Sequence, residues 1–489
     1  MSSPGKTSVR SIRRHAVPTW WRDAKLGIFV HWTPASVPAF APTTDEIGEL
    51  LAAGRADALG WSPYTEWYEN SLRFPGSPVA EHHRATYPGK PYRDFARDWE
   101  AALDGWDPDD WARRFAAAGA RYVVFVTKHH DGYCLWPSEV RNPHVRDWES
   151  RRDVVGELAE AVRAQGMRFG VYYSGGLDWT WNDHPIGRVT DLAVAQPRGD
   201  YVAYAEAHVR ELIARYRPSV LWNDISWPAP ASRLAPLLGE YYDAVPDGVV
   251  NDRFLPWSPV FAAAKAAPVR KIIDGVIARG ARQESGIIPP RPPMFDVRTP
   301  EYTVFDSIQT TPWECVRGID KSFGHNEFSD ESDFLSRRDL LWSIVDIASK
   351  NGNLLLNVGP RGVDAAIAPA QLERLVWLAD FGPTLETALR STRPWIVPEG
   401  PGRGFEVRYV AADRDVRALV RGTEPTTASA EVTLAEVTAT PTTQVRDVDG
   451  AALAWAPTSK GLRVTLDSPI DSDVPTAVLL TDVVAAPRG

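Results

Sequence analysis

The strongest constraint on the fold is an alternation of amphipathic helices with short apolar runs between about residues 20 and 390. A helix follows the Asp-rich turn at 107–110, with Trp111 and Phe115 on one face, and Gly119 marks its end. The next run, RYVVFVTK, suits a strand that is buried on both faces, as parallel strands are. The same cycle continues through MRFGVYYS and SVLWND, which predicts a βα fold with parallel strands.

The length of this alternating region favours a closed barrel over an open sheet, since no Gly-rich phosphate loop follows an early strand. After about Pro398 short β-like runs follow one another without helices, as in GFEVRYV, VRALVRG, GLRVTLD and TAVLLTD. Such runs are typical of a small antiparallel sandwich. We therefore expect an α/β chain with a (β/α)8-like barrel over residues 1–395 and a C-terminal antiparallel β-sandwich over residues 396–489.

Composition excludes several classes of partner. The net charge of -9 and the pI of about 5.7 disfavour nucleic acid, whose phosphates an acidic surface repels. No apolar run is long enough for a membrane span, and the N-terminal segment lacks the apolar core of a signal peptide. The two cysteines, Cys134 and Cys315, cannot form a disulfide framework. We therefore expect a cytoplasmic protein with no membrane and no nucleic-acid partner.

Polar, ionisable or aromatic residues follow the apolar run of each predicted strand. In a barrel, the carboxyl ends of the strands meet at one face, where function sits. We therefore expect one shared pocket that holds imidazoles, aromatic rings, a guanidinium and carboxylates, but no thiol. These groups suit the hydrolysis of a glycosidic bond, in which one carboxylate attacks or activates water and another protonates the leaving oxygen. The residues that follow the strands are His31 and Trp32; His129, His130 and Asp131; Tyr172 and Tyr173; Asn223 and Asp224; and Asn251, Asp252 and Arg253.

Asp224 is the strongest candidate for a catalytic carboxylate among these residues. It ends an apolar strand and shares a strand face with Trp222, because positions i and i+2 point the same way. A helix N-cap is the alternative role, but the following segment, ISWPAPASRL, is broken by proline. The adjacent pair His129 and His130 is typical of some metal sites, yet neighbours on a strand point to opposite sides. We therefore predict neither a metal nor a cofactor.

An ordered series of motifs resembles the α-L-fucosidases of glycoside hydrolase family 29. The resemblance implies an irregular (β/α)-barrel with a C-terminal β-sandwich. It also implies an exo-acting, retaining hydrolase that releases terminal α-L-fucosyl residues through a covalent fucosyl-enzyme. The substrate would be a fucosylated oligosaccharide or glycoconjugate, and the protein can be oligomeric. The series runs AKLGIFVHW, TEWYENSLRFPGS, VTKHHDGYCLW, RFGVYYSGGLDW, LWND, VVNDR, TPEY, WECVRGIDKSFGHN and SKNGNLLLNVGPRGVD, and spans about residues 20–365.

By this resemblance Asp224 is the nucleophile and Phe323 packs against the methyl group of fucose. The acid/base is carried over to Glu301, because it stands in a TPEY-like element, with Glu314 and Glu284 as alternatives. The remaining fucose-binding groups that the resemblance implies are His31, Glu66, Trp67, His129, His130, Tyr172, Trp222 and Arg253.

The chain departs from the family pattern at three places. Thr33 stands where the family usually has Gly, and we expect its side chain to narrow the pocket entrance or to reach a sugar hydroxyl. His325 replaces the usual aromatic residue after SFG. Segment 42–61 looks like an insertion that covers the pocket and changes which aglycones fit.

Two other functions stay open. One is a barrel glycosidase for a related sugar such as an α-L-galactoside, and the other is a non-catalytic fucose-binding protein.

Overall fold

A computed structural model describes residues 8–485 except 54, 56, 260–262, 264–265, 284–285, 401–403 and 426–428. Its larger sheet has seven parallel strands in the order β5-β4-β3-β2-β1-β7-β6. Nearly every side chain in these strands is buried, as expected for strands covered on both faces. The strands are β1 (Leu26–Val30), β2 (Tyr122–Lys128), β3 (Arg168–Ser174), β4 (Val220–Asp224), β5 (Val249–Val250), β6 (Trp313–Gly318) and β7 (Gly352–Val358).

Segment 296–301 fills the gap between β5 and β6, although it is not a regular strand. Isolated parallel bridges join Asn251 to Val297 on one side and Glu301 to Val316 on the other. Backbone hydrogen bonds accompany these bridges. The ring of strands is thus closed through an irregular connection, and the predicted barrel is confirmed.

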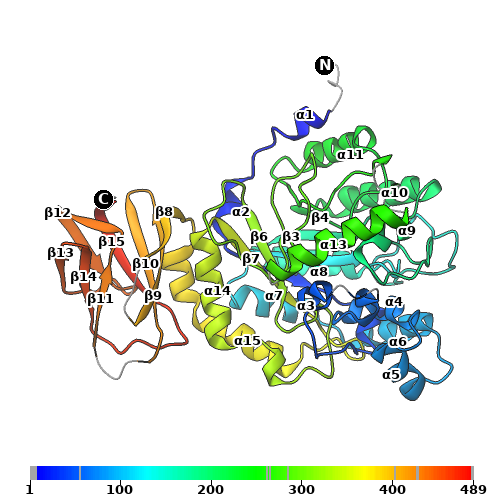
Figure 1. The fold of residues 1–489 in the computed structure, drawn as a ribbon, viewed down its shortest axis with the longest axis horizontal. Coiled ribbons are helices and arrows are strands. Elements are labelled where there is room, and N and C mark those ends of the chain that lie inside the picture. Colours follow the sequence, from blue (N-terminus) through cyan, green and yellow to red (C-terminus); the bar gives the residue numbers. More distant parts are fainter. Residues whose placement is uncertain are drawn as a thin grey trace.

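Helices surround this ring, as Figure 1 shows. The helix predicted after residues 107–110 is α7, in which the Asp107 side chain accepts from the N–H of Asp110 and Trp111 and Phe115 are buried. The larger helices are α7 (Pro108–Ala117), α8 (Val154–Ala164), α10 (Asp200–Tyr216), α11 (Ala231–Ala244), α13 (Ala267–Gln283), α14 (Arg337–Ser349) and α15 (Pro369–Asp380).

Shorter helices connect the strands and build the rim of the barrel. Among the helices described, none combines the length and the apolar character needed to cross a lipid bilayer. The shorter helices are α1 (Val9–Ile12), α2 (Thr19–Ala24), α3 (Ile47–Ala52), α4 (Tyr68–Leu72), α5 (Pro78–Thr86), α6 (Phe95–Ala102), α9 (Leu192–Ala195) and α16 (Gly382–Thr384).

The C-terminal region forms two antiparallel sheets, of five strands in the order β12-β15-β10-β9-β8 and of three in the order β11-β14-β13. Side chains from both sheets share one apolar core, which includes Val407 and Val464. The sandwich lies beside α14, where Arg408 pairs with Asp346. Its strands are β8 (Arg393–Gly400), β9 (Phe405–Ala412), β10 (Asp415–Gly422), β11 (Ala430–Leu434), β12 (Val437–Arg446), β13 (Trp455–Thr458), β14 (Gly461–Leu466) and β15 (Thr476–Ala485).

Candidate active site

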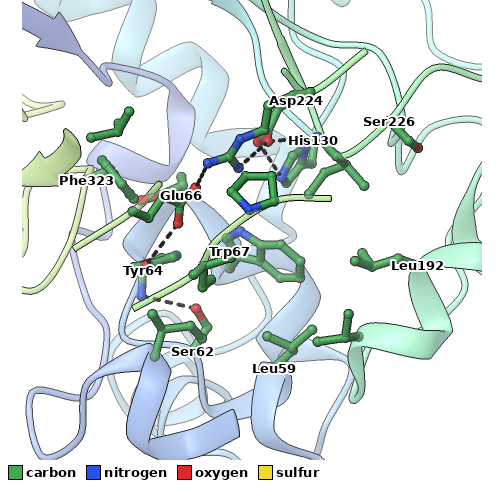
Figure 2. A pocket seen from close by; sticks show the side chains of 18 of the residues that line it. Leu59, Ser62, Tyr64, Glu66, Trp67, His130, Leu192, Asp224, Ser226 and Phe323 are labelled. Atoms are coloured by element: carbon green, nitrogen blue, oxygen red, sulfur yellow. Dashed lines mark hydrogen bonds and ion pairs between the residues drawn. The ribbon is translucent and has the colours of Figure 1, made fainter. Parts of the chain in front are cut away.

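A cavity of about 610 Å³ opens at the carboxyl ends of the barrel strands. The residues predicted as nucleophile, acid/base or fucose-binding groups line it, and Figure 2 shows several of them around one space. The strands and the residues directly after them bring most of these side chains together. Glu66 and Trp67 come from the short 3-10 helix Thr65–Trp67, Phe323 from a loop and Glu301 from segment 296–301. The predicted residues that line the cavity are His31, Glu66, Trp67, His129, His130, Tyr172, Trp222, Asp224, Arg253, Glu301 and Phe323. The expectation of one shared pocket is wrong for six other strand-end residues, which do not line the cavity: Trp32, Asp131, Tyr173, Asn223, Asn251 and Asp252.

Asp224 ends β4 with both carboxylate oxygens hydrogen-bonded. The Tyr172 hydroxyl donates to Oδ2 over 2.8 Å. The backbone N–H of Ile225 and the Nη1 of Arg253 donate to Oδ1 over 2.8 and 3.2 Å. His130 Nε2 lies 3.7 Å from Oδ2. These donors fix the carboxylate in one orientation at the cavity wall.

Arg253 connects the two predicted catalytic carboxylates. Its Nη1 faces Asp224, and its Nη2 lies 2.6 Å from Glu301 Oε1. Thr299 holds the same guanidinium through its hydroxyl and its carbonyl oxygen, at 3.1 and 2.9 Å. The other oxygen of Glu301 accepts from the Tyr64 hydroxyl at 3.5 Å. One guanidinium therefore keeps two carboxylates in a common cavity.

Burial and charge act in opposite directions on Glu301. Burial raises the pKa of Glu301 above its ordinary value, the Arg253 cation lowers it, and the neighbouring Asp224 raises it again, so the net shift is upward. A raised pKa keeps a carboxylic acid protonated nearer to neutral pH, as a general acid requires.

Glu66 is the third buried carboxyl group of the cavity. Burial raises the pKa of Glu66 to about 8. Its Oε2 accepts from the backbone N–H of Gly324 at 3.0 Å. A Cβ at Gly324 would lie 2.3 Å from Thr65 Oγ1, so only glycine allows this close approach. Phe323, the preceding residue, turns its ring toward His31 and Tyr64, with centroids 5.1 Å from each.

The three histidines of the cavity are held as neutral rings. Burial lowers the pKa of His31 and of His130 to about 4. His31 Nδ1 contacts the side-chain oxygen of Asn357 at 2.5 Å, and His130 Nδ1 contacts the hydroxyl of Ser174 at 2.7 Å. His129 Nδ1 is buried without a hydrogen-bond partner among the described residues. Neutral imidazoles with free nitrogens can both donate to and accept from sugar hydroxyls.

Two trios of side chains present metal-type ligand atoms within 4.8 Å of one another. The first is His31, Glu66 and His129, and the second is His129, His130 and Asp224. These are the same groups that face the cavity, where sugar hydroxyls would compete for them.

The two alternative acids have different positions. Glu314 is buried inside the barrel, where it accepts from the Tyr122 hydroxyl at 2.8 Å and from Trp222 Nε1 at 3.1 Å, and it does not line the cavity. Burial raises the pKa of Glu314 to about 7. Glu284 lies outside the described residues.

The structure shows where the three departures from the family pattern lie relative to the cavity. Thr33 is buried at the start of a short helix turn and does not line the cavity, so the expectation that it narrows the entrance is wrong. His325 pairs with Glu327 at 3.0 Å and does not line the cavity. Segment 42–61 does contribute wall residues, among them Ile47 and Leu59.

Sequence reasoning missed three polar residues that hold the site, Tyr64, Thr299 and Asn357. Each acts on a side chain far away in the chain, as in the contact of Tyr64 with Glu301. Asn357 follows the apolar run of β7, so the rule that located the other strand-end residues would also have found it. Chemically, the pocket is that of a glycoside hydrolase of the barrel class.

Comparisons with known proteins specify the family. A model of the α-L-fucosidase family matches residues 2–382. An α-L-fucosidase of Branchiostoma floridae is 30% identical over 475 residues, which cover 94% of this chain and 91% of the relative. Human tissue α-L-fucosidase is 28% identical over 400 residues, with 79% and 72% covered. The solved structure of Thermotoga maritima α-fucosidase is 35% identical, covers 97% of this chain and 99% of its own, and has a TM-score of 0.78. The chain belongs to the α-L-fucosidase family and is thus a glycoside hydrolase.

Proposed function

We propose that the protein hydrolyses terminal α-L-fucosides with retention of configuration, through a covalent fucosyl-enzyme on Asp224. The observation that carries this proposal is the bridge by which Arg253 holds both Asp224 and Glu301 at one cavity. Retaining glycosidases need their two carboxyl groups close together, about 5–5.5 Å apart, because no water has to fit between nucleophile and sugar. The family relationship supports fucose as the sugar, and a Thermotoga maritima relative with 35% identity has been solved in complex with fucose.

In the first step the Asp224 carboxylate attacks the anomeric carbon while Glu301 gives its proton to the leaving oxygen. The bond between sugar and aglycone breaks, and the aglycone leaves as an alcohol. In the second step Glu301, now ionised, takes a proton from water, and that water releases fucose from Asp224. The raised pKa of Glu301 favours the protonated form that the first step needs.

The remaining residues account for the binding of fucose. His31, His129 and His130 are neutral and face the cavity, which suits the sugar hydroxyls. The ring of Phe323, packed among other aromatic rings, offers an apolar surface for a methyl group. An α-L-galactoside carries a hydroxyl at that position and would leave it without a partner. Comparison of an aryl α-L-fucoside with the matching α-L-galactoside tests this choice.

The decisive experiment removes the nucleophile. We expect Asp224→Gly to abolish turnover of aryl α-L-fucosides, since attack at the anomeric carbon is lost. Azide should restore part of the rate and give a fucosyl azide of inverted configuration, because the small anion takes the place of the side chain. An Asp224→Gly variant with the rate of the wild type would overturn the proposal. A wild-type protein that binds fucosides without releasing fucose would favour a non-catalytic role.

A further inference from the structure

The cavity extends well beyond the sugar-binding groups, and its outer wall is aliphatic. Leu192 comes from α9, Ile273 and Ile277 from α13, and Ile47, Leu51 and Leu59 from α3 and the segment after it. Figure 2 shows Leu59 and Leu192 on the part of the wall that lies apart from Asp224 and Phe323. A volume of about 610 Å³ falls within the roughly 300–1,000 Å³ of pockets that hold drug-sized ligands, which leaves space for more than one sugar ring.

The few polar side chains in this outer wall already have partners within the protein. Gln196 Nε2 donates to Ser226 Oγ at 2.6 Å. Thr190 Oγ1 donates to Asp274 at 2.8 Å, and Ser62 Oγ accepts from the N–H of Tyr64 at 3.2 Å. The hydroxyls of a second sugar would lose water here and meet only a few polar side chains, each already engaged in one hydrogen bond, which makes their burial unfavourable.

The aliphatic wall adjoins the predicted proton donor, and thus the side of the leaving group. The N–H of Ile287 donates to the carbonyl oxygen of Glu301 at 3.0 Å, and the N–H of Glu301 donates back at 2.8 Å. Ile287 and the next residue, Ile288, both line the cavity. A general acid lies next to the oxygen that it protonates, so groups beside Glu301 contact the aglycone.

We propose that the outer cavity is a binding site for an apolar aglycone, so that the preferred substrates are α-L-fucosides of apolar alcohols or phenols and not fucosyl oligosaccharides. The proposal rests on the proposed fucosidase activity and specifies the substrate of the same site. Burial of an alkyl or fused-ring aglycone against the wall removes apolar surface from water and requires no hydrogen bond to the protein.

A series of alkyl α-L-fucosides tests this inference. Methyl, butyl and hexyl fucosides have leaving alcohols of similar acidity, so differences in kcat/KM report on aglycone binding. Full burial of one methylene group raises affinity by roughly fourfold, and we therefore expect hexyl to exceed methyl by at least about 30-fold. Fucosyl-α-1,2-galactose should be hydrolysed less efficiently than the hexyl fucoside, even though a sugar hydroxyl is the better leaving group.

Helix α13 offers a matched pair of variants. Ile273 and Ile277 line the cavity, whereas their neighbours Ile272 and Val276 are 69% and 63% exposed. We expect Ile273→Asn with Ile277→Asn to lower the ratio of hexyl to methyl kcat/KM at least about fivefold. Ile272→Asn with Val276→Asn makes comparable changes on the same helix and should leave that ratio unchanged. The exposed pair, Ile272→Asn with Val276→Asn, should also keep methyl fucoside hydrolysis within about twofold of the wild type.

The outcomes separate the inference from the function on which it rests. If no fucoside of any chain length is hydrolysed, the proposed function fails. If methyl fucoside is hydrolysed but kcat/KM is flat along the series, or the disaccharide is the best substrate, only the apolar aglycone site is overturned. Equal effects of the two double variants would also overturn it, because they would point to the stability of the helix.

Discussion

The guanidinium of Arg253 lies 2.6 Å from the carboxyl group of Glu301. Burial raises the pKa of Glu301, this ion pair lowers it and Asp224 raises it, so that the net shift is upward. A cation in this place therefore tunes the pH at which the proton for the leaving group is lost, and the same cation also contacts Asp224.

Arg253→Met should move the alkaline limb of the kcat/KM profile to higher pH. Loss of the cation disfavours the Glu301 carboxylate, so the pKa of Glu301 rises further and the acid stays protonated over a wider range. The profile should be measured with an alkyl fucoside, which needs the proton. Arg253→Lys keeps a positive charge and serves as the control. An alkaline limb that stays in place or moves to lower pH in Arg253→Met would contradict this role.

Glu301→Ala should affect substrates according to their leaving groups. General acid catalysis contributes about 10²–10⁴-fold to rate, so hydrolysis of methyl α-L-fucoside should fall by that order. Activated aryl fucosides leave without a proton, and the loss in their first step should be much smaller. A series of aryl fucosides with graded leaving groups measures this difference. Equal losses across the series would move the acid role to Glu314 or Glu284.

Glu66→Gln should change how stability depends on pH. Burial raises the pKa of Glu66 from 4.5 to about 8, so folding favours the protonated form. The stability from this group is fully present below about pH 4.5 and is lost as the pH rises toward 8. Gln resembles the protonated carboxyl group at every pH. As the pH rises from about 5 to about 9, the unfolding temperature of Glu66→Gln should therefore increase relative to that of the wild type. Unfolding temperatures that run parallel across this range would show that Glu66 ionises normally.

Glu314→Ala should destabilise the fold and leave the leaving-group dependence intact. Glu314 accepts from Tyr122 and Trp222 in the barrel interior, and its loss leaves two buried donors without a partner. We expect a decrease in the free energy of unfolding of about 2–4 kcal/mol, measured by urea denaturation. Glu314→Gln keeps an acceptor oxygen and should lose less. A selective loss on substrates with poor leaving groups, at unchanged stability, would instead assign Glu314 the acid role.

Much of the site could be predicted because parallel strands put their carboxyl ends at one face of the sheet. This rule, applied to apolar runs alone, brought His31, His129, Asp224 and Arg253 to one cavity. Phe323 lies in a loop, where periodicity carries no such signal, so only the resemblance to a family located it. The same holds for Glu66, Trp67 and Glu301.

Other features depend on contacts that no local pattern encodes. Tyr64 contacts Glu301 across 237 residues of chain, and segment 296–301 completes the ring without the alternation of a strand. Helix α13 also escaped prediction, although its paired aliphatic residues recur four positions apart. The predicted division near residue 395, the compartment and the oligomeric state stay predictions.

Two backbone hydrogen bonds join Ile287, which lines the proposed aglycone site, to Glu301, the proposed proton donor. Substrate selection and proton transfer are therefore coupled through the main chain. We expect an aglycone that displaces Ile287 to displace Glu301 as well, so a poorly fitting group should slow the chemical step in addition to binding weakly. A substitution at Ile287 that alters selectivity should therefore also disturb turnover. New specificities should arise more readily on α3 and α13, which no such pair ties to Glu301 in the described structure.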